Sequence, residues 1–449
     1  MRMPRFVRML AAFLIGAMFV QLLHACSINS QAAGKTRLTI ATVNNGDMVV
    51  MQSLSQRFTD ANPDIELRWV VLEENVLRQR TTTDVSSQGG QFDVLTIGSY
   101  ETPIWARRGW LTPLDQLPAD YDPNDILKPI REGLSQDGKL YAVPFYGESS
   151  MLYYRTDLFE KAGITVPEQP TYAQVGEWAS KVHDPANGVY GMCLRGKPGW
   201  GENMGFVSTL VNTFGGQWFD TNWQPTINTP AWNNAITFYV NLLQEYGPPG
   251  ASSNGFNENL ALFSTGKCGM WVDATVAAGL LSNPKESQVA DRLGFARAPI
   301  AEYPNGSNWL WAWALAVPKT SKSPEAAQKF VAWATSKEYI QLVAEQEGWV
   351  SVPPGTRTST YTNPNYQKAA PFAEIVLRSI QAADISKPAA NPTPYKGIQY
   401  VDIPEFQAIG SSVGQTMAAA LTNRLSVDEA LQQSQNTAER FMKHTGYIE

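Results

Sequence analysis

Residues 37–72 read RLTIATVNNGDMVVMQSLSQRFTDANPDIELRWVVL, and this stretch decides the fold class. Residues 37–43 alternate apolar and polar side chains, which predicts a β-strand. Residues 48–61 place apolar side chains at helical spacing, and the Asn-Pro pair that follows predicts the end of that helix. Residues 65–72 predict a second strand. Because a strand, a helix and a strand in this order form a βαβ unit, the chain is expected to open with a parallel sheet.

Strand and helix patterns continue to alternate along the chain. Strands are predicted at residues 92–97, 140–145, 151–154, 268–273, 293–298 and 309–317. Helices are predicted at residues 172–183, 230–246 and 324–335, and after Ser426. Thr171 with Gln174, and Ser426 with Glu429, have the spacing of capping boxes at helix starts. Because the strands fall into two clusters, the pattern indicates α/β architecture with two lobes.

The first 33 residues have the pattern of an export signal. Three arginines precede an apolar run at residues 9–20, which is shorter than the roughly 20 residues that a bilayer requires. Residues 23–26 (LHAC) resemble a bacterial lipoprotein box, in which Cys26 would be the lipidated first residue. Cleavage near residue 32 is the alternative. We therefore expect a periplasmic or extracellular protein, either free or lipid-anchored through Cys26.

The composition excludes several classes of protein. The 449 residues carry 35 Lys and Arg against 41 Asp and Glu, with no basic run, which is unsuited to nucleic acid. Only three His and three Cys are present, so a His-based triad or a metal cluster is not expected. Neither signal route leaves Cys26 to the folded core, and Cys193 and Cys268 then form one disulfide or remain two buried thiols. We expect no enzymatic activity, no metal and no cofactor.

Several short segments, in this order and spacing, resemble the family-1 extracellular solute-binding proteins of ABC transporters, of the maltose-binding type. They are FDV (92–94), WLTPLD (110–115), GKLYAVP (138–144) and YYRTDLF (153–159). Three others more narrowly resemble the polyol-binding branch, which serves mannitol, sorbitol and arabitol uptake. These are WLWAWALAVP (309–318), WATSKEY (333–339) and GWVSVPPGTR (348–357).

The resemblance implies an α/β periplasmic-binding-protein fold with two lobes, a hinge and a ligand cleft between the lobes. It places residues 35–145 and 313–352 in the first lobe, and residues 146–312 and 353–449 in the second. The implied function is capture of a linear polyol by cleft closure and its delivery to a membrane permease, by a monomer. A binding protein for a mono- or oligosaccharide remains an alternative, as does a carbohydrate-active hydrolase.

A polyol carries hydroxyl groups that donate and accept hydrogen bonds, on a chain with apolar C–H faces. Its site therefore needs amides and carboxylates for the hydroxyls and an aromatic wall for the C–H surface. Because the ligand is uncharged, acids in the site should be balanced by arginine.

Five candidate contacts occur in the first third of the chain. Asn45 and Asp47 follow the first predicted strand, although Asp47 could instead cap a helix. Tyr100 and Glu101 follow the strand at 92–97, at a sheet edge where ligands bind in open α/β folds. Glu148 lies where the resemblance places the first crossing between lobes, and there the family commonly has a ligand-binding acid.

The later candidates combine aromatic and charged side chains. Arg195 and Trp200 lie in a glycine-rich loop. Strand alternation puts Trp271 and Asp273 on one face, which predicts an acid beside an aromatic clamp. The same alternation puts the three tryptophans of residues 309–313 on one face. We expect Trp309 and Trp311 to reach the cleft and Trp313 to lie in the core.

Overall fold

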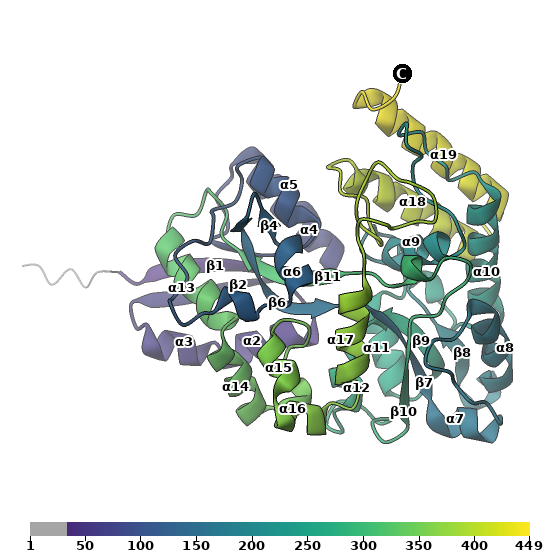
Figure 1. Ribbon diagram of the computed structural model, residues 1–449, viewed down its shortest axis with the longest axis horizontal. Helices are drawn as coiled ribbons and strands as arrows, with labels where there is room; N and C mark the ends of the chain where they lie inside the picture. Colours follow the sequence, from purple (N-terminus) through teal and green to yellow (C-terminus); the bar gives the residue numbers. More distant parts are fainter. Residues whose placement is uncertain (1–33) are drawn as a thin grey trace, which may run out of the picture.

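The computed structural model describes residues 34–449, so the expected export signal and Cys26 lie outside the described residues. The described chain forms two lobes, each built around its own β-sheet (Figure 1). This confirms the predicted two-lobed α/β architecture. None of the helices in residues 34–449 is long and apolar enough to cross a bilayer.

The first lobe contains a five-stranded sheet in the order β2-β1-β3-β11-β6. Strand β1 pairs in parallel with β2 and with β3, as the βαβ pattern predicts, whereas β11 runs antiparallel to β3 and β6. The strands are β1 (Thr36–Val43), β2 (Ile65–Leu72), β3 (Val94–Gly98), β6 (Ala142–Glu148) and β11 (Trp311–Ala316), beside a small hairpin of β4 (Ser135–Gln136) and β5 (Lys139–Leu140).

Helices cover both faces of this sheet (Figure 1). The helix predicted at residues 48–61 is divided at Ser55, where the backbone hydrogen-bonding pattern breaks. The helices of the lobe are α2 (Gly46–Leu54), α3 (Gln56–Ala61), α4 (Glu74–Ser87), α5 (Glu101–Arg107), α6 (Lys128–Gly133), α13 (Pro324–Ala334) and α14 (Lys337–Gln346).

The second lobe contains a four-stranded sheet in the order β10-β7-β9-β8. Strands β8 and β9 are parallel, and β7 is antiparallel to β9 and β10. The strands are β7 (Ser150–Arg155), β8 (Tyr190–Cys193), β9 (Cys268–Ala274) and β10 (Leu293–Arg297).

Both predicted capping boxes, at Thr171 and at Ser426, are confirmed in the second lobe. The helices of this lobe are α7 (Thr156–Lys161), α8 (Tyr172–Val182), α9 (Asn203–Thr213), α10 (Pro230–Tyr246), α11 (Phe256–Ser264), α12 (Ala277–Ser282), α17 (Ala373–Ala382), α18 (Phe406–Leu421) and α19 (Val427–His444). Helices α15 (Thr358–Thr362) and α16 (Pro364–Ala369) lead into α17.

The chain crosses between the lobes where β6 leads into β7, where Trp309 leads into β11, and again after α14. The first and last crossings touch through Gly147 and Gly355, since a Cβ on either residue would collide with the backbone of the other. The Gly147 N–H also donates to the Pro354 carbonyl at 2.9 Å. Because these segments meet at one place, they can serve together as the hinge.

Residues next to these crossings keep contacts with the first lobe. Strand β6 stays in the first sheet as far as Glu148, and β11 joins that sheet at Trp311. After the last crossing, the Arg357 guanidinium still donates to the carbonyls of Asp122 and Thr335, each at 3.1 Å. Glu148 and Arg357 therefore both keep contacts with the first lobe.

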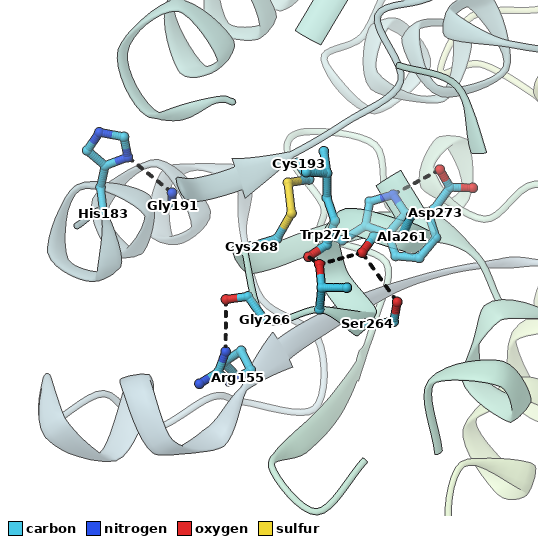
Figure 2. The surroundings of a disulfide bond; sticks show 12 residues. Arg155, His183, Gly191, Cys193, Ala261, Ser264, Gly266, Cys268, Trp271 and Asp273 are labelled. Carbon is cyan, nitrogen blue, oxygen red and sulfur yellow. Dashed lines mark hydrogen bonds between the residues drawn. A yellow bond between two sulfur atoms is a disulfide. The ribbon is translucent and has the colours of Figure 1, made fainter. Parts of the chain in front are cut away.

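A disulfide between Cys193 and Cys268 joins β8 to β9, which decides between the two states left open by the sequence (Figure 2). Both cysteines are buried. Cys193 lies opposite Trp271 in the parallel register. The disulfide thus ties together the strands that precede Arg195 and carry Asp273.

Candidate functional site

A cavity with about 510 Å³ of empty space, including the part open to solvent, lies between the two lobes. The residues that line it come from both lobes and from the crossings: Asn45, Glu74, Arg78, Tyr146, Glu148, Arg195, Trp200, Gly201, Gly205, Phe256, Ala274, Val276, Trp309, Trp311, Trp313 and Gln399.

Four tryptophans form an aromatic wall of this cavity: Trp200, Trp309, Trp311 and Trp313. The rings of Trp311 and Trp313 meet edge to face with centroids 5.6 Å apart, and Trp200 meets Trp311 at 6.0 Å. Trp313 is buried in the hydrophobic core, as predicted, but it also lines the cavity. Trp311 and Trp313 project from the same face of β11, and that face turns toward the cavity.

Arg78 of α4 stands against this wall, and the sequence analysis missed it. Its guanidinium carbon lies 4.1 Å from the ring centre of Trp200 and 4.7 Å from that of Trp313. It donates to Glu74 at 2.9 Å and to Glu101 at 2.6 Å. Burial opposes its charge, but the two carboxylates outweigh this effect and raise the pKa of Arg78. Glu101 therefore holds Arg78 in place and does not line the cavity.

A weak signal for Glu74 and Arg78 was present in the sequence. They are four residues apart, the spacing of an ion pair on one helix face. The strand at 65–72 ends just before them, at the edge where open α/β sheets bind ligands. The helix has little amphipathic pattern, since its sequence is ENVLRQRTTTDVSS, and no helix was predicted there.

Arg195 forms a second buried charge cluster, on the other lobe. Its Nε and Nη2 donate to Asp273 at 2.9 and 2.6 Å, and its Nη1 donates to the Gly201 carbonyl at 3.0 Å. The Glu202 carboxylate lies 3.7 Å away. Burial opposes the charge of Arg195, but Asp273 outweighs it and raises the pKa of the guanidinium.

Trp271 and Asp273 share a face of β9, as predicted, but neither lines the cavity. The Trp271 indole N–H donates to Asp273 at 3.0 Å (Figure 2). The Trp271 ring packs between Tyr153 and Phe256, with centroids 5.4 and 5.6 Å away. Trp271 is thus a core residue, and Asp273 acts on the cavity through Arg195.

Glu148 and Asn45 present polar groups to the cavity. Asn45 donates to the Tyr146 hydroxyl at 2.8 Å, and its side-chain carbonyl remains available as an acceptor. Glu148 is the last residue of β6 and is only 6% exposed. Burial raises the pKa of its carboxyl to about 8.

Two polar groups of the aromatic wall lack a partner within residues 34–449. The indole N–H groups of Trp200 and Trp309 are buried and make no hydrogen bond there. Buried donors in proteins are nearly always satisfied. A ligand with several oxygen atoms would supply the acceptors.

Tyr100 and Asp47 lie outside the cavity. The Tyr100 hydroxyl donates to the Ile403 carbonyl of the second lobe at 2.8 Å, and its ring is 4.6 Å from that of Trp200. Asp47 lies beside α12 at the lobe interface, where burial raises its pKa to about 7. It does not cap α2, whose N-cap position is occupied by Asn45.

The lobes are closed over the cavity. The Lys197 ammonium is 2.5 Å from Glu73, and the Asn75 amide donates to the Pro198 carbonyl at 3.2 Å. In both contacts one partner belongs to the first lobe and the other to the second. The two charge clusters and the aromatic wall therefore enclose one site.

The chain matches the family model of the bacterial extracellular solute-binding protein over residues 44–341. It is 55% identical over 416 residues to the mannitol-binding protein of Pseudomonas aeruginosa, covering 93% of this chain and 95% of that one.

Two solved structures resemble this chain over most of its length. The first is an ABC transporter solute-binding protein from Agrobacterium vitis with bound D-mannitol, which is 59% identical with a TM-score of 0.91, covering 92% of this chain and 100% of that one. The second is an ABC transporter solute-binding protein from Agrobacterium radiobacter in complex with ribitol, which is 25% identical with a TM-score of 0.79, covering 90% of this chain and 98% of that one. The chain therefore belongs to the bacterial extracellular solute-binding proteins.

Proposed function

We propose that this protein is the substrate-binding component of an ABC importer and captures a linear polyol, with D-mannitol as the first candidate. The observation that carries this proposal is the closed cavity, which combines a tryptophan wall with hydrogen-bonding groups on both lobes. The C–H face of a polyol would pack on the indole rings, and its hydroxyls would bond to Asn45, Glu148 and the free indole N–H groups.

The charge distribution supports an uncharged ligand. Each guanidinium in the cavity already contacts two carboxylates, Arg78 with Glu74 and Glu101, and Arg195 with Asp273 and Glu202. Neither arginine is therefore left as an unpaired cation that would select an acidic ligand. A neutral polyol fits this balance better than a sugar acid does.

The same contacts argue against a hydrolase. A glycoside hydrolase needs two carboxyl groups placed on either side of the scissile bond. Among the acids named above as candidate contacts, Glu148 and Asp273 are the pair to consider for this role. Asp273 receives hydrogen bonds from Arg195, Trp271 and the Ala274 N–H, so it is not free to act as a base or nucleophile. We propose binding without catalysis.

Isothermal titration calorimetry with hexitols, pentitols, glucose and maltose would test the ligand class. We expect D-mannitol to bind and the disaccharide to bind more weakly or not at all, since the closed lobes leave limited space. Tight binding of maltose with no response to any polyol would overturn the proposal in favour of an oligosaccharide. Release of product from aryl glycosides would overturn the absence of catalysis.

Membership of the family implies a periplasmic or extracellular location, and we further propose a membrane permease as the partner. The measurement is ATP hydrolysis by the cognate transporter in proteoliposomes, which should rise only when this protein and its polyol are both present. Lipidation at Cys26 would be detected by the mass of the mature N-terminus. A mature chain that begins after residue 26 would exclude the anchor.

A further inference from the structure

Glu148 differs from the other acids around the cavity because no partner holds it. The charged groups of Glu74, Glu101 and Asp273 each bond to a guanidinium. In the part of the chain that the structure describes, no hydrogen bond or ion pair stabilises the Glu148 carboxyl. Its position at the end of β6, opposite Trp311 in the register, nevertheless fixes it at the cavity wall.

The charges near Glu148 do not favour a further anion. Four carboxylates already contact the two guanidiniums of the cavity, and one of them, Glu202, is also 3.4 Å from the Lys197 ammonium. An ionised Glu148 would therefore be a fifth negative charge against three positive ones. Burying an unpaired carboxylate is costly, and such a group takes up a proton instead.

We propose that Glu148 is the uncharged acid of this site, which takes up a proton from solvent as the lobes close and donates it in a hydrogen bond to a ligand hydroxyl. This inference rests on the proposed function, because it requires a hydroxylated ligand in the cavity. A protonated carboxyl offers one donor and one acceptor, which matches a hydroxyl group, whereas a carboxylate can only accept.

The groups that face Glu148 support this protonation state. Burial is the largest influence and raises its pKa, Arg195 lowers it, and the nearby acids raise it again, with the result near 8. The titratable and charged groups that face it from the surrounding elements are Asp47 on α2, Glu74 and Arg78 on α4, Tyr146 on β6, Tyr153 on β7, Arg195 after β8 and Asp273 on β9.

Proton uptake follows from the closing motion. In an open cleft, water reaches Glu148 and its pKa approaches the ordinary value of 4.5. In the closed cleft the pKa is about 8. At pH 7 the open form is therefore ionised and the closed form protonated, so binding should take up about one proton per ligand. Between these two pKa values the affinity should fall by up to about tenfold for each unit that the pH rises.

The test is titration calorimetry of D-mannitol binding at pH 7 in two buffers with different ionisation enthalpies. The difference in observed enthalpy gives the number of protons taken up. Wild-type protein should take up close to one proton. Glu148→Gln, which keeps the shape and the donor, should take up fewer protons by most of one proton per ligand, and its affinity should fall less steeply between pH 6 and 8 than that of the wild type.

Asp47→Asn is the matched control, because Asp47 is another buried acid with a raised pKa but lies outside the cavity. The Asp47→Asn variant should take up fewer protons than the wild type by no more than the fraction that Asp47 itself contributes. Mannitol binding by wild-type protein without proton uptake, or equal uptake in Glu148→Gln and wild type, would overturn this inference alone. No binding of any polyol at any pH would overturn the proposed function and this inference with it. Melting of each variant without ligand shows that it is folded.

Discussion

Replacing Gly201 with alanine should hinder closure of the cleft without harming the fold. Gly201 lies in the second lobe, and a Cβ there would overlap the Glu74 carboxylate and lie 3.0 Å from the Nε and Nη2 of Arg78. Glu74 and Arg78 belong to the first lobe, so the collision exists only when the lobes are closed. The φ angle of Gly201 is not in the left-handed region, and alanine can adopt its backbone conformation.

The size of the effect follows from the contacts that the methyl group displaces. Glu74 accepts hydrogen bonds from Arg78 Nε at 3.1 Å and Nη2 at 2.9 Å. To admit the methyl group, Glu74 must move away from Arg78, which keeps Glu101 as its other partner. Losing a hydrogen bond to a charged group costs about 1.5–3 kcal/mol. Since about 1.4 kcal/mol is a factor of ten, mannitol affinity should fall about 10- to 150-fold.

Titration calorimetry with D-mannitol measures this loss directly. Gly176→Ala is the matched control, because its Cβ would meet only Phe238, at an ordinary 3.4 Å, within the second lobe. The control should bind as wild type does, and both variants should melt near the wild-type temperature without ligand. If Gly201→Ala bound mannitol as tightly as the wild type does, the reasoning would be refuted. Gly201 and Glu74 could not then lie this close together in the ligand-bound form.

Four other changes test separate parts of the site and its support. Trp309→Phe removes an indole N–H that has no hydrogen-bond partner among residues 34–449. It should weaken mannitol binding about 2- to 12-fold, the value of one neutral hydrogen bond, as measured by calorimetry. Replacing Cys193 and Cys268 together with serine opens a link between residues 75 apart and should lower the free energy of unfolding by about 4 kcal/mol, measured by urea titration; an unchanged midpoint would contradict this. Burial raises the pKa of Asp47 from 3.8 to about 7, so between these values the folded state holds a proton that the unfolded state releases. As the pH rises from about 4 to 7, the melting temperature of the wild type should therefore fall relative to that of Asp47→Asn. Parallel plots of melting temperature against pH for the two proteins would contradict this. Lys197→Met removes a partly exposed bridge to Glu73 and should weaken binding less than about fivefold, with the difference shrinking at high salt.

Much of the fold was predictable because its signals are local. The alternation at residues 37–43 and 65–72 and the helical spacing between them are properties of neighbouring side chains, and β1 and β2 do pair in parallel. The capping boxes at Thr171 and Ser426 depend on residues three positions apart. The division of the first helix at Ser55 was not predicted, since the apolar spacing continues across it.

The site was only partly predictable. Six of the predicted contacts line one cavity: Asn45, Glu148, Arg195, Trp200, Trp309 and Trp311. Tyr100 and Glu101 lie outside the cavity and contact the residues that line it, and Asp47 lies elsewhere in the lobe interface. Glu74 and Arg78 were missed because they belong to a helix with almost no amphipathic pattern, and their role comes from tryptophans far along the chain.

The sequence by itself determined that there are two α/β lobes, where most strands lie, and which side chains share a strand face. Only the tertiary structure decided which way each face turns. Trp271 and Asp273 share a face, and so do Trp311 and Trp313, yet the first pair turns into the second lobe and the second pair lines the cavity. The two-residue period of a strand relates its side chains to one another. Which face meets the cleft depends instead on helices and loops distant in sequence that pack against the sheet.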